Sequence, residues 1–201
     1  YTVAVETYNA SGTGGRTEKS VITLPDAATI SGIVPIEGTE DTVMASVYGV
    51  KGSDHYVWEL YDHLGNPVIT NESNENVHPF KVTPNSQYSL HVRAVNDSGS
   101  SIMSIRHFQA LPTLVGLHIV NVEANAVHLG WQSVTGDVYY DLYRDDRKDG
   151  VRIGAEGTVI GDTYTSVTKA TYTPDMIGYS DTNLQSGTEY HYRVAAANGA
   201  G

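Results

Sequence analysis

YSLHVRAVNDSG, the segment of residues 88–99, alternates between two rows of side chains along its first eight positions. Tyr88, Leu90, Val92 and Ala94 form one row, and mostly polar or charged residues occupy the positions between them. Successive side chains of a β-strand point to opposite faces of the sheet, so the pattern predicts a strand with one buried face. The strand leads into Asn-x-x-Gly, whose Asn and Gly suit the unusual backbone angles of a tight turn.

The same pattern occurs twice more along the chain. It reads YTVAVETYNASG at residues 1–12 and YHYRVAAANGAG at residues 190–201. The approach to the strand also repeats, because VTPNSQY at 82–88 matches LQSGTEY at 184–190. Repetition of one supersecondary unit indicates tandem copies of one domain type. No stretch has apolar residues at helical spacing for long enough to predict a helix, so the chain is expected to be all-β.

Two further pairs of segments correspond in the same order. VMASV at 43–47 matches VHLGW at 127–131, and each is followed by a glycine, Gly52 or Gly136. An aromatic strand comes next in both copies, YVWEL at 56–60 and YDLYR at 140–144.

Taken together, these segments resemble fibronectin type III domains. That family has a Trp on its second strand, a Leu-x-Pro-x-Thr-x-Tyr approach to its sixth strand, and then Tyr-x-Val-x-Ala-x-Asn-x-x-Gly. The resemblance implies tandem immunoglobulin-like β-sandwiches with a tyrosine corner, in which the Tyr hydroxyl bonds back to the preceding turn. It assigns core positions to Trp131, Tyr88 and Tyr190. Val47 stands where the middle copy should have its Trp, and Trp58 is expected to fill that volume instead.

The repeats predict three segments. Residues 1–25 correspond to the C-terminal hairpin of a truncated domain, residues 26–111 to a complete domain, and residues 112–201 to a domain without its last strand. A lone hairpin is marginal in water, so flanking sequence is expected. The linkers at 24–26 and 110–112 are short and contain proline, which restricts the backbone and predicts a semi-rigid array.

Composition excludes several classes of function. The 201 residues include no cysteine, which excludes disulfides, zinc–cysteine sites and cysteine nucleophiles. The formal net charge is −11 with only 12 lysines and arginines, and such a surface repels phosphate backbones, so no nucleic-acid partner is expected. No apolar run approaches the ~18 residues of a transmembrane helix, so no membrane insertion is expected.

No catalytic, cofactor or metal site is predicted. An acidic run offers oxygen atoms of the kind that calcium binds, but its spacing is not that of a calcium-binding loop and basic residues lie among the carboxylates. A solvated turn is therefore the preferred interpretation, and calcium binding stays the alternative for Asp141, Asp145, Asp146 and Asp149. Three histidines alternate with core positions and are expected to face solvent, namely His91, His128 and His191. A Ser/His/Asp group brought together by chance is also expected, given how common these residues are.

The last copy is longer than the middle one. From Gly136 to Tyr190 there are 54 residues, against 36 from Gly52 to Tyr88, an excess of 18. The extra residues, 161–174, alternate Tyr or Val with Thr and predict an added hairpin or ordered loop. Long insertions are often functional. Partner contact is therefore predicted at Tyr164, Thr165, Thr168, Thr171, Tyr172 and Thr173.

Tyrosines of the last copy have two interpretations. Aromatic faces stack on sugar rings, which favours glycan binding. Tyr is also common in half-buried strands, which favours an ordinary core or surface role. Both interpretations apply to Tyr139, Tyr143, Tyr164, Tyr172 and Tyr179.

These observations predict a non-catalytic structural spacer or adhesion module of a larger extracellular, cell-surface or virion protein. A phage tail or tail-fibre component or a bacterial surface protein fits best, with neighbouring domains, identical copies, virion proteins or host-surface glycan as partners. The alternative is an accessory module, carbohydrate-binding or linker, of a secreted glycoside hydrolase. A third possibility is an assembly in which the terminal strands of one chain complete a domain of another.

Overall fold

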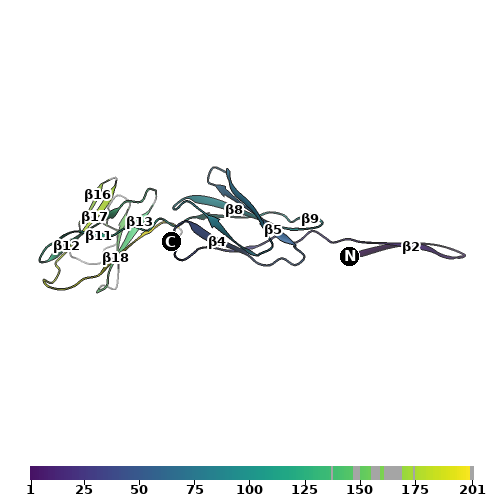
Figure 1. Cartoon of the computed structure of the whole chain (residues 1–201), viewed down its shortest axis with the longest axis horizontal. Helices are drawn as coiled ribbons and strands as arrows, with labels where there is room; N and C mark the ends of the chain where they lie inside the picture. Colours follow the sequence, from purple (N-terminus) through teal and green to yellow (C-terminus); the bar gives the residue numbers. More distant parts are fainter. Residues whose placement is uncertain (137, 147–149, 155–158, 161–168, 174, 200–201) are drawn as a thin grey trace. The chain divides into compact units, whose positions relative to one another are not determined.

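The chain folds entirely into β-structure where the computed structural model describes it. The described residues are 1–136, 138–146, 150–154, 159–160, 169–173 and 175–199, and within them every regular element is a strand (Figure 1). The expectation of an all-β fold is confirmed. Within the same residues, no helix exists that is long and apolar enough to span a bilayer.

Two compact units make up the chain. The first comprises Tyr1–Val34, Thr42–Lys81 and Gln87–Phe108, and the second comprises Pro35–Asp41, Val82–Ser86 and Gln109–Gly201. The domain limits 1–25, 26–111 and 112–201 stay predictions.

A two-stranded hairpin opens the first unit. Strands β1 (Thr2–Asn9) and β2 (Gly12–Ser20) pair antiparallel, and every residue in both is exposed. The apolar row that includes Val3 and Val5 therefore contacts no second sheet in this structure. The turn matches its prediction, because Gly12 has a φ of 137° and the backbone N–H of Ser11 donates to Oδ1 of Asn9 at 2.9 Å.

The remainder of the first unit forms two sheets. One has the order β3-β4-β7, and the other has the order β10-β8-β5-β6 with β9 paired to β8. Their bounds are β3 (Ile30–Pro35), β4 (Thr42–Val47), β5 (His55–Asp62), β6 (Pro67–Ser73), β7 (Val77–Lys81), β8 (Gln87–Asn96), β9 (Gly99–Ser100) and β10 (Ser104–Gln109). All of the inter-strand pairs described are antiparallel.

The core of this sandwich follows the predicted alternation. Along β8, each second residue from Tyr88 to Asn96 is buried. Trp58 on β5 is 0% exposed and lies near Phe80 and Tyr56, with ring centroids 6.3 and 6.1 Å away. Val47 at the end of β4 is also buried. Trp58 from β5 thus lies in this core. The sequence predicts this position for it, because Val47 stands where the family has its tryptophan.

The second unit contains two four-stranded sheets. Their orders are β11-β12-β17-β16 and β15-β14-β13-β18. The bounds are β11 (His118–Val122), β12 (Ala126–Gln132), β13 (Tyr139–Arg144), β14 (Val151–Gly154), β15 (Val159–Ile160), β16 (Lys169–Thr173), β17 (Met176–Thr182) and β18 (Tyr192–Ala197). Inward-facing side chains of both sheets pack around Trp131, which is 0% exposed, with Tyr140 at 5.7 Å between ring centroids.

The extra length of the second unit includes two short strands, β15 and β16. β15 pairs with β14 in one sheet, whereas β16 pairs with β17 in the other. Thr173 of β16 pairs with Met176 of β17, so residues 169–173 form one arm of an antiparallel hairpin with β17. Residues 161–168 and 174 lie outside the described residues, and the predicted alternatives of an added hairpin or an ordered loop stay predictions for them. β15 and β16 each occupy an edge of a sheet, where an added strand satisfies backbone hydrogen-bonding groups.

Tyrosine hydroxyls secure corresponding turns in the two sandwiches. The hydroxyl of Tyr56 accepts a hydrogen bond from the backbone N–H of Val50 at 2.9 Å, and that of Tyr140 accepts one from Val134 at 2.6 Å. Both tyrosines thus bond six residues upstream. The sequence paired these two strands but did not predict the bonds.

The stability of the first unit should fall as the pH drops from 7.5 to 5. Burial lowers the pKa of His78, which stacks on Trp58 at 6.0 Å and hydrogen-bonds Asn71 at 2.9 Å. A lowered folded pKa means that the unfolded chain takes up the proton more readily. The stability that His78 contributes is therefore complete above the ordinary histidine pKa near 6.5. It is lost as the pH falls through the lowered pKa of the folded state.

Thermal melting against pH measures this effect. We expect His78→Gln to melt with a weaker pH dependence than the parent chain, and His63→Gln, at an exposed position, to keep the full dependence. The His78→Gln variant should keep part of the pH dependence of melting, because burial also lowers the pKa of His91. An unchanged pH profile in His78→Gln would contradict this account.

Candidate functional site

Three of the six residues nominated for partner contact lie on β16. Thr171, Tyr172 and Thr173 lie on this edge strand, opposite Gly178, Ile177 and Met176 of β17. Tyr164, Thr165 and Thr168 lie outside the described residues. β16 is an edge strand of the β11-β12-β17-β16 sheet, and a groove lies on the outer face of this sheet, lined by residues of β11, β12 and β17 and by Glu123.

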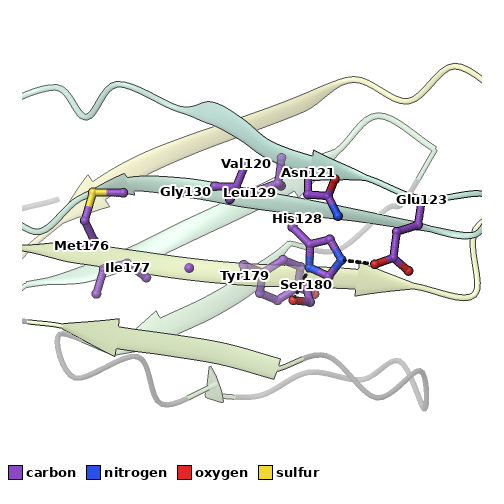
Figure 2. A pocket seen from close by; sticks show the side chains of 11 residues that line it. Val120, Asn121, Glu123, His128, Leu129, Gly130, Met176, Ile177, Tyr179 and Ser180 are labelled. Atoms are coloured by element: carbon purple, nitrogen blue, oxygen red, sulfur yellow. Dashed lines mark hydrogen bonds and ion pairs between the residues drawn. The ribbon is translucent and has the colours of Figure 1, made fainter.

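This groove, here called the His128 groove, has a volume of about 500 Å³. It runs over β11, β12 and β17, and Figure 2 shows Met176 towards one end and Glu123 towards the other. Side chains of β12 and β17 alternate, so Leu129, Trp131, Ile177 and Tyr179 enter the core. His128, Gly130, Gly178 and Ser180 consequently belong to the outer face.

A polar cluster forms one end of the groove. Nδ1 of His128 lies 2.9 Å from Oγ of Ser180, and Nε2 lies 3.3 Å from Oε1 of Glu123 (Figure 2). Ser180 faces His128 in the register of β17 and β12, which brings the hydroxyl to the ring. The expectation that His128 faces solvent needs correction. It stands on the outer face, but its neighbours cover about two thirds of the side chain, which is 31% exposed.

The serine, histidine and carboxylate of this cluster resemble a hydrolytic triad in composition. Such a triad also needs donors that stabilise an oxyanion. Ser180 lies within β17, and it is paired with His128 of β12 on one side and with Lys169 of β16 on the other. The geometry supports orientation of polar groups at a surface groove.

Sequence reasoning missed this site. The sequence contains one weak indication of it. Gly130 and Gly178 each lie inside a strand whose other residues alternate between apolar and polar. A glycine inside a strand often marks close approach by another group. Their pairing across β12 and β17 is visible only in the structure.

Directly behind the groove, β17 contributes a buried charge. Asp181 is 1% exposed, and its Oδ2 accepts hydrogen bonds from Nη1 of Arg144 at 2.7 Å and from the hydroxyl of Tyr192 at 3.0 Å. Arg144 and Tyr192 lie on β13 and β18, so this Asp181 clamp joins the two sheets. The domain has no cysteine with which to link its sheets covalently.

The electrostatics of the clamp are mutually supporting. Burial lowers the pKa of Arg144, but hydrogen bonds and attraction from Asp146 and Asp181 outweigh it, and the net shift is upward. Burial, followed by the charge of Asp181, raises the pKa of Tyr192. Arg144 therefore stays charged and Tyr192 stays neutral throughout the physiological range.

The acidic run is neutralised by arginines. Asp141 pairs with Arg152, and the other two described carboxylates, Asp145 and Asp146, pair with Arg193 and Arg144. Asp149 lies outside the described residues. Among the residues that the structure describes, no group of three side chains is arranged to hold a metal ion.

The tyrosines divide between core and surface. Tyr179 is buried, whereas Tyr143 is 42% exposed. Tyr139 is partly buried, with the guanidinium of Arg152 lying 3.8 Å from its ring centroid. Tyr164 and the side chain of Tyr172 are outside the description. The three described tyrosines do not form one exposed aromatic cluster, because strand alternation sends Tyr179 inward.

The four anchor residues differ in burial. Trp131, Trp58 and Tyr88 are buried, and Tyr88 stacks on Phe108 at 5.6 Å. Tyr190 is only partly buried, contrary to expectation, because it precedes β18 and is not part of the sheet. Arg144 lies over its ring, 5.0 Å from the centroid. Its hydroxyl accepts a hydrogen bond from the backbone N–H of Gln185 at 2.9 Å, which is the predicted tyrosine corner.

Two asparagines of the repeated Asn-x-x-Gly pattern hold the segment that precedes their own sandwich. The side-chain amide of Asn96 donates to the carbonyl of Thr23 at 2.8 Å, and that of Asn198 donates to the carbonyl of Ala110 at 2.8 Å. Both asparagines are buried. The repeat therefore encodes attachment of each linker.

No family model matches this sequence, and no curated protein matches it. Solved structures with similar folds include FN3tt, at 21% identity over 46% of this chain and 100% of that one, with a TM-score of 0.40. The FN1–FN3 domains of chicken CNTN1 align at 15% identity over 100% of this chain and 70% of theirs, with a TM-score of 0.38. A two-domain fibronectin type III segment from chicken tenascin aligns at 12% identity over 87% of this chain and 91% of that one, with a TM-score of 0.41.

The strand pairing of the chain itself defines the class. Each sandwich packs one sheet containing the second strand against another containing the third and sixth strands. The chain consists of tandem fibronectin type III-like β-sandwiches, preceded by a hairpin of the same repeat.

Proposed function

We propose that this chain is a non-catalytic spacer and adhesion module of a larger multidomain protein. The observation that carries the proposal is the repeated asparagine that bonds each linker to the sandwich following it. A buried amide that loses its carbonyl partner costs about 1–3 kcal/mol, so each of these bonds holds the preceding segment to the sandwich that follows it. Restricted linkers suit a protein that must set a distance between other parts of an assembly.

A phage tail or tail fibre, or a bacterial surface protein, is the proposed setting, at a virion or cell surface. The acidic, cysteine-free and Tyr- and Gly-rich composition supports it. Neighbouring domains, identical copies, virion proteins and host-surface glycan are the proposed partners, with Tyr164, Thr165, Thr168, Thr171, Tyr172 and Thr173 as candidate contacts. The His128 groove favours a second candidate, an accessory carbohydrate-binding module of a secreted glycoside hydrolase.

Distance measurements between spin labels test the spacer role. The absence of cysteine allows labels to be introduced at Lys51→Cys and Glu189→Cys, two exposed positions in different sandwiches. We expect a narrow distance distribution in the parent chain and a broader one in Asn198→Ala, because the carbonyl of Ala110 loses its donor.

Asn125→Ala, at an exposed position of the same sandwich, serves as the control and should leave the distribution narrow. A parent chain whose distribution is already as broad as that of Asn198→Ala would rule out a spacer of defined length.

A further inference from the structure

The outer face of the β11-β12-β17-β16 sheet has two neighbouring glycines within the His128 groove, Gly130 and Gly178. Gly130 and Gly178 face each other in register, so two adjacent outer positions carry no side chain. Neither glycine has a positive φ, so backbone conformation does not require glycine there. Gly130 is buried beneath side chains of β11, and a Cβ there would lie 2.9 Å from Nε2 of His118 and 2.9 Å from Cγ2 of Val120.

An irregularity in β11 shapes one wall. The register with β12 shifts between Ile119 and Asn121, which leaves Val120 as an extra residue. A bulge of this kind re-aims side chains and is common beside binding sites. Both Val120 and Asn121 line the groove.

The polar end presents groups that are oriented yet accessible. The ring of His128 is held from both sides by Ser180 and Glu123. The Glu123 side chain is 55% exposed, so its carboxylate can still accept hydrogen bonds from a ligand. The amide of Asn121 adds both donors and acceptors. Adjacent hydroxyl groups of a ligand would find several partners here.

The other end is apolar. Met176 and Val120 offer aliphatic and thioether surface, and Met adapts its shape to what it contacts. A volume of about 500 Å³ falls within the range of small-molecule sites. The net charge of −11 and the carboxylate in the groove disfavour an anionic ligand.

We propose that the His128 groove binds a neutral saccharide, with its hydroxyl groups at the Glu123, Asn121 and Ser180 end and its C–H face against Met176 and Val120. The proposal deepens the adhesive part of the function proposed above and rests on it. It concerns residues of β11, β12 and β17 that the sequence analysis did not nominate.

Titration of the ¹⁵N-labelled full chain with glucose, galactose, N-acetylglucosamine and glucuronate tests the proposal by NMR. We expect at least one neutral sugar to shift amide signals of residues 119–123, 128–130 and 176–180, with a dissociation constant on the order of 1 mM. Glucuronate should bind more weakly. Titration with a trisaccharide of the sugar that binds then identifies the natural ligand. If the ligand is a polysaccharide, the trisaccharide should bind more tightly than the monosaccharide, and if it is a single terminal sugar, the two should bind equally well.

Gly178→Val should weaken binding at least about tenfold, because its side chain enters the groove. Gly116→Val is the matched control, since a Cβ there meets nothing within 4 Å and φ is not positive, so binding should persist. Glu123→Ala, at an exposed position, should also weaken binding and covers the case in which Gly178→Val fails to fold.

Absence of localised shifts at sugar concentrations about tenfold above the expected constant would overturn the proposal. Binding that survives both Gly178→Val and Glu123→Ala, or that is equally strong for glucuronate, would overturn it too. The spin-label experiment does not involve the groove. A failure to bind saccharide would therefore leave the spacer role standing, and a broad distance distribution would leave saccharide binding standing.

Discussion

Asp181→Ala should destabilise the second sandwich by about 3–5 kcal/mol, the range expected when one partner of a buried ion pair is removed. Arg144, whose side chain is only 13% exposed, would keep its charge with Asp146 as its remaining carboxylate partner. Tyr192 would lose the acceptor of its hydroxyl as well. Because the clamp joins β17 to β13 and β18, its loss should loosen both sheets together.

Chemical denaturation followed by tryptophan fluorescence measures this effect separately for each sandwich. The chain has two tryptophans, one in each sandwich, so Trp131 fluorescence in a Trp58→Phe background reports the second alone. Asp145→Ala is the matched control. It removes an exposed carboxylate 3.4 Å from Arg193, and such surface pairs contribute about 0–1 kcal/mol.

Replacing both charged residues shows whether the stability lost in Asp181→Ala comes from the unpaired charge of Arg144 or from any substitution at this site. Arg144→Met with Asp181→Leu should recover much of the stability lost in Asp181→Ala, because a buried pair exchanged for apolar side chains is often neutral. If Asp181→Ala denatures with the same midpoint as the parent, the clamp does not hold the sheets together.

Trp131→Ala should cost the second sandwich roughly 3–5 kcal/mol, the usual loss for a large aromatic removed from a core. The indole is 0% exposed and packs with Tyr140, and no collapse of two sheets can fill so large a space. Circular dichroism during chemical denaturation measures the change after the fluorophore is removed.

Trp131→Phe should cost less than Trp131→Ala. Within the described residues, the buried indole N–H of Trp131 has no hydrogen-bond partner, so its removal leaves no acceptor unsatisfied. Trp58→Ala is the counterpart in the first sandwich and should lower only the transition of that sandwich. A Trp131→Ala chain that unfolds like the parent would show that the residue is not a core anchor.

Much of the fold was predictable because it depends on short-range pattern. The alternation in 88–99 predicted which side chains of β8 are buried, and the Asn-x-x-Gly pattern predicted turns in which Gly12 and Gly99 have φ values of 137° and 133°. The sequence correspondence between two aromatic segments, 56–60 and 140–144, predicted that they occupy equivalent positions in two sandwiches, and they form β5 and β13. These features follow from strand geometry and local backbone sterics, which neighbouring residues determine.

The candidate site was not predictable in the same way. His128, Ser180 and Glu123 meet because β12 pairs with β17 in one particular register, which no local pattern specifies. The Asp181 clamp likewise joins residues 37 and 11 positions apart, and the partners of an Asp in the inward row of β17 cannot be named until the opposite sheet is known.

The sequence by itself determined the class of fold, the repeat and the positions of the turns, because each follows from side-chain alternation and from residues with special backbone freedom. Only the tertiary structure decided how deeply each copy of the repeat is buried. The row beginning at Tyr88 is covered by a second sheet, that after Tyr190 is partly covered, and that beginning at Tyr1 is exposed. The physical reason is that the apolar row of a strand is buried only where another sheet packs against it. Strands with the same alternation therefore differ in burial when different surfaces face them.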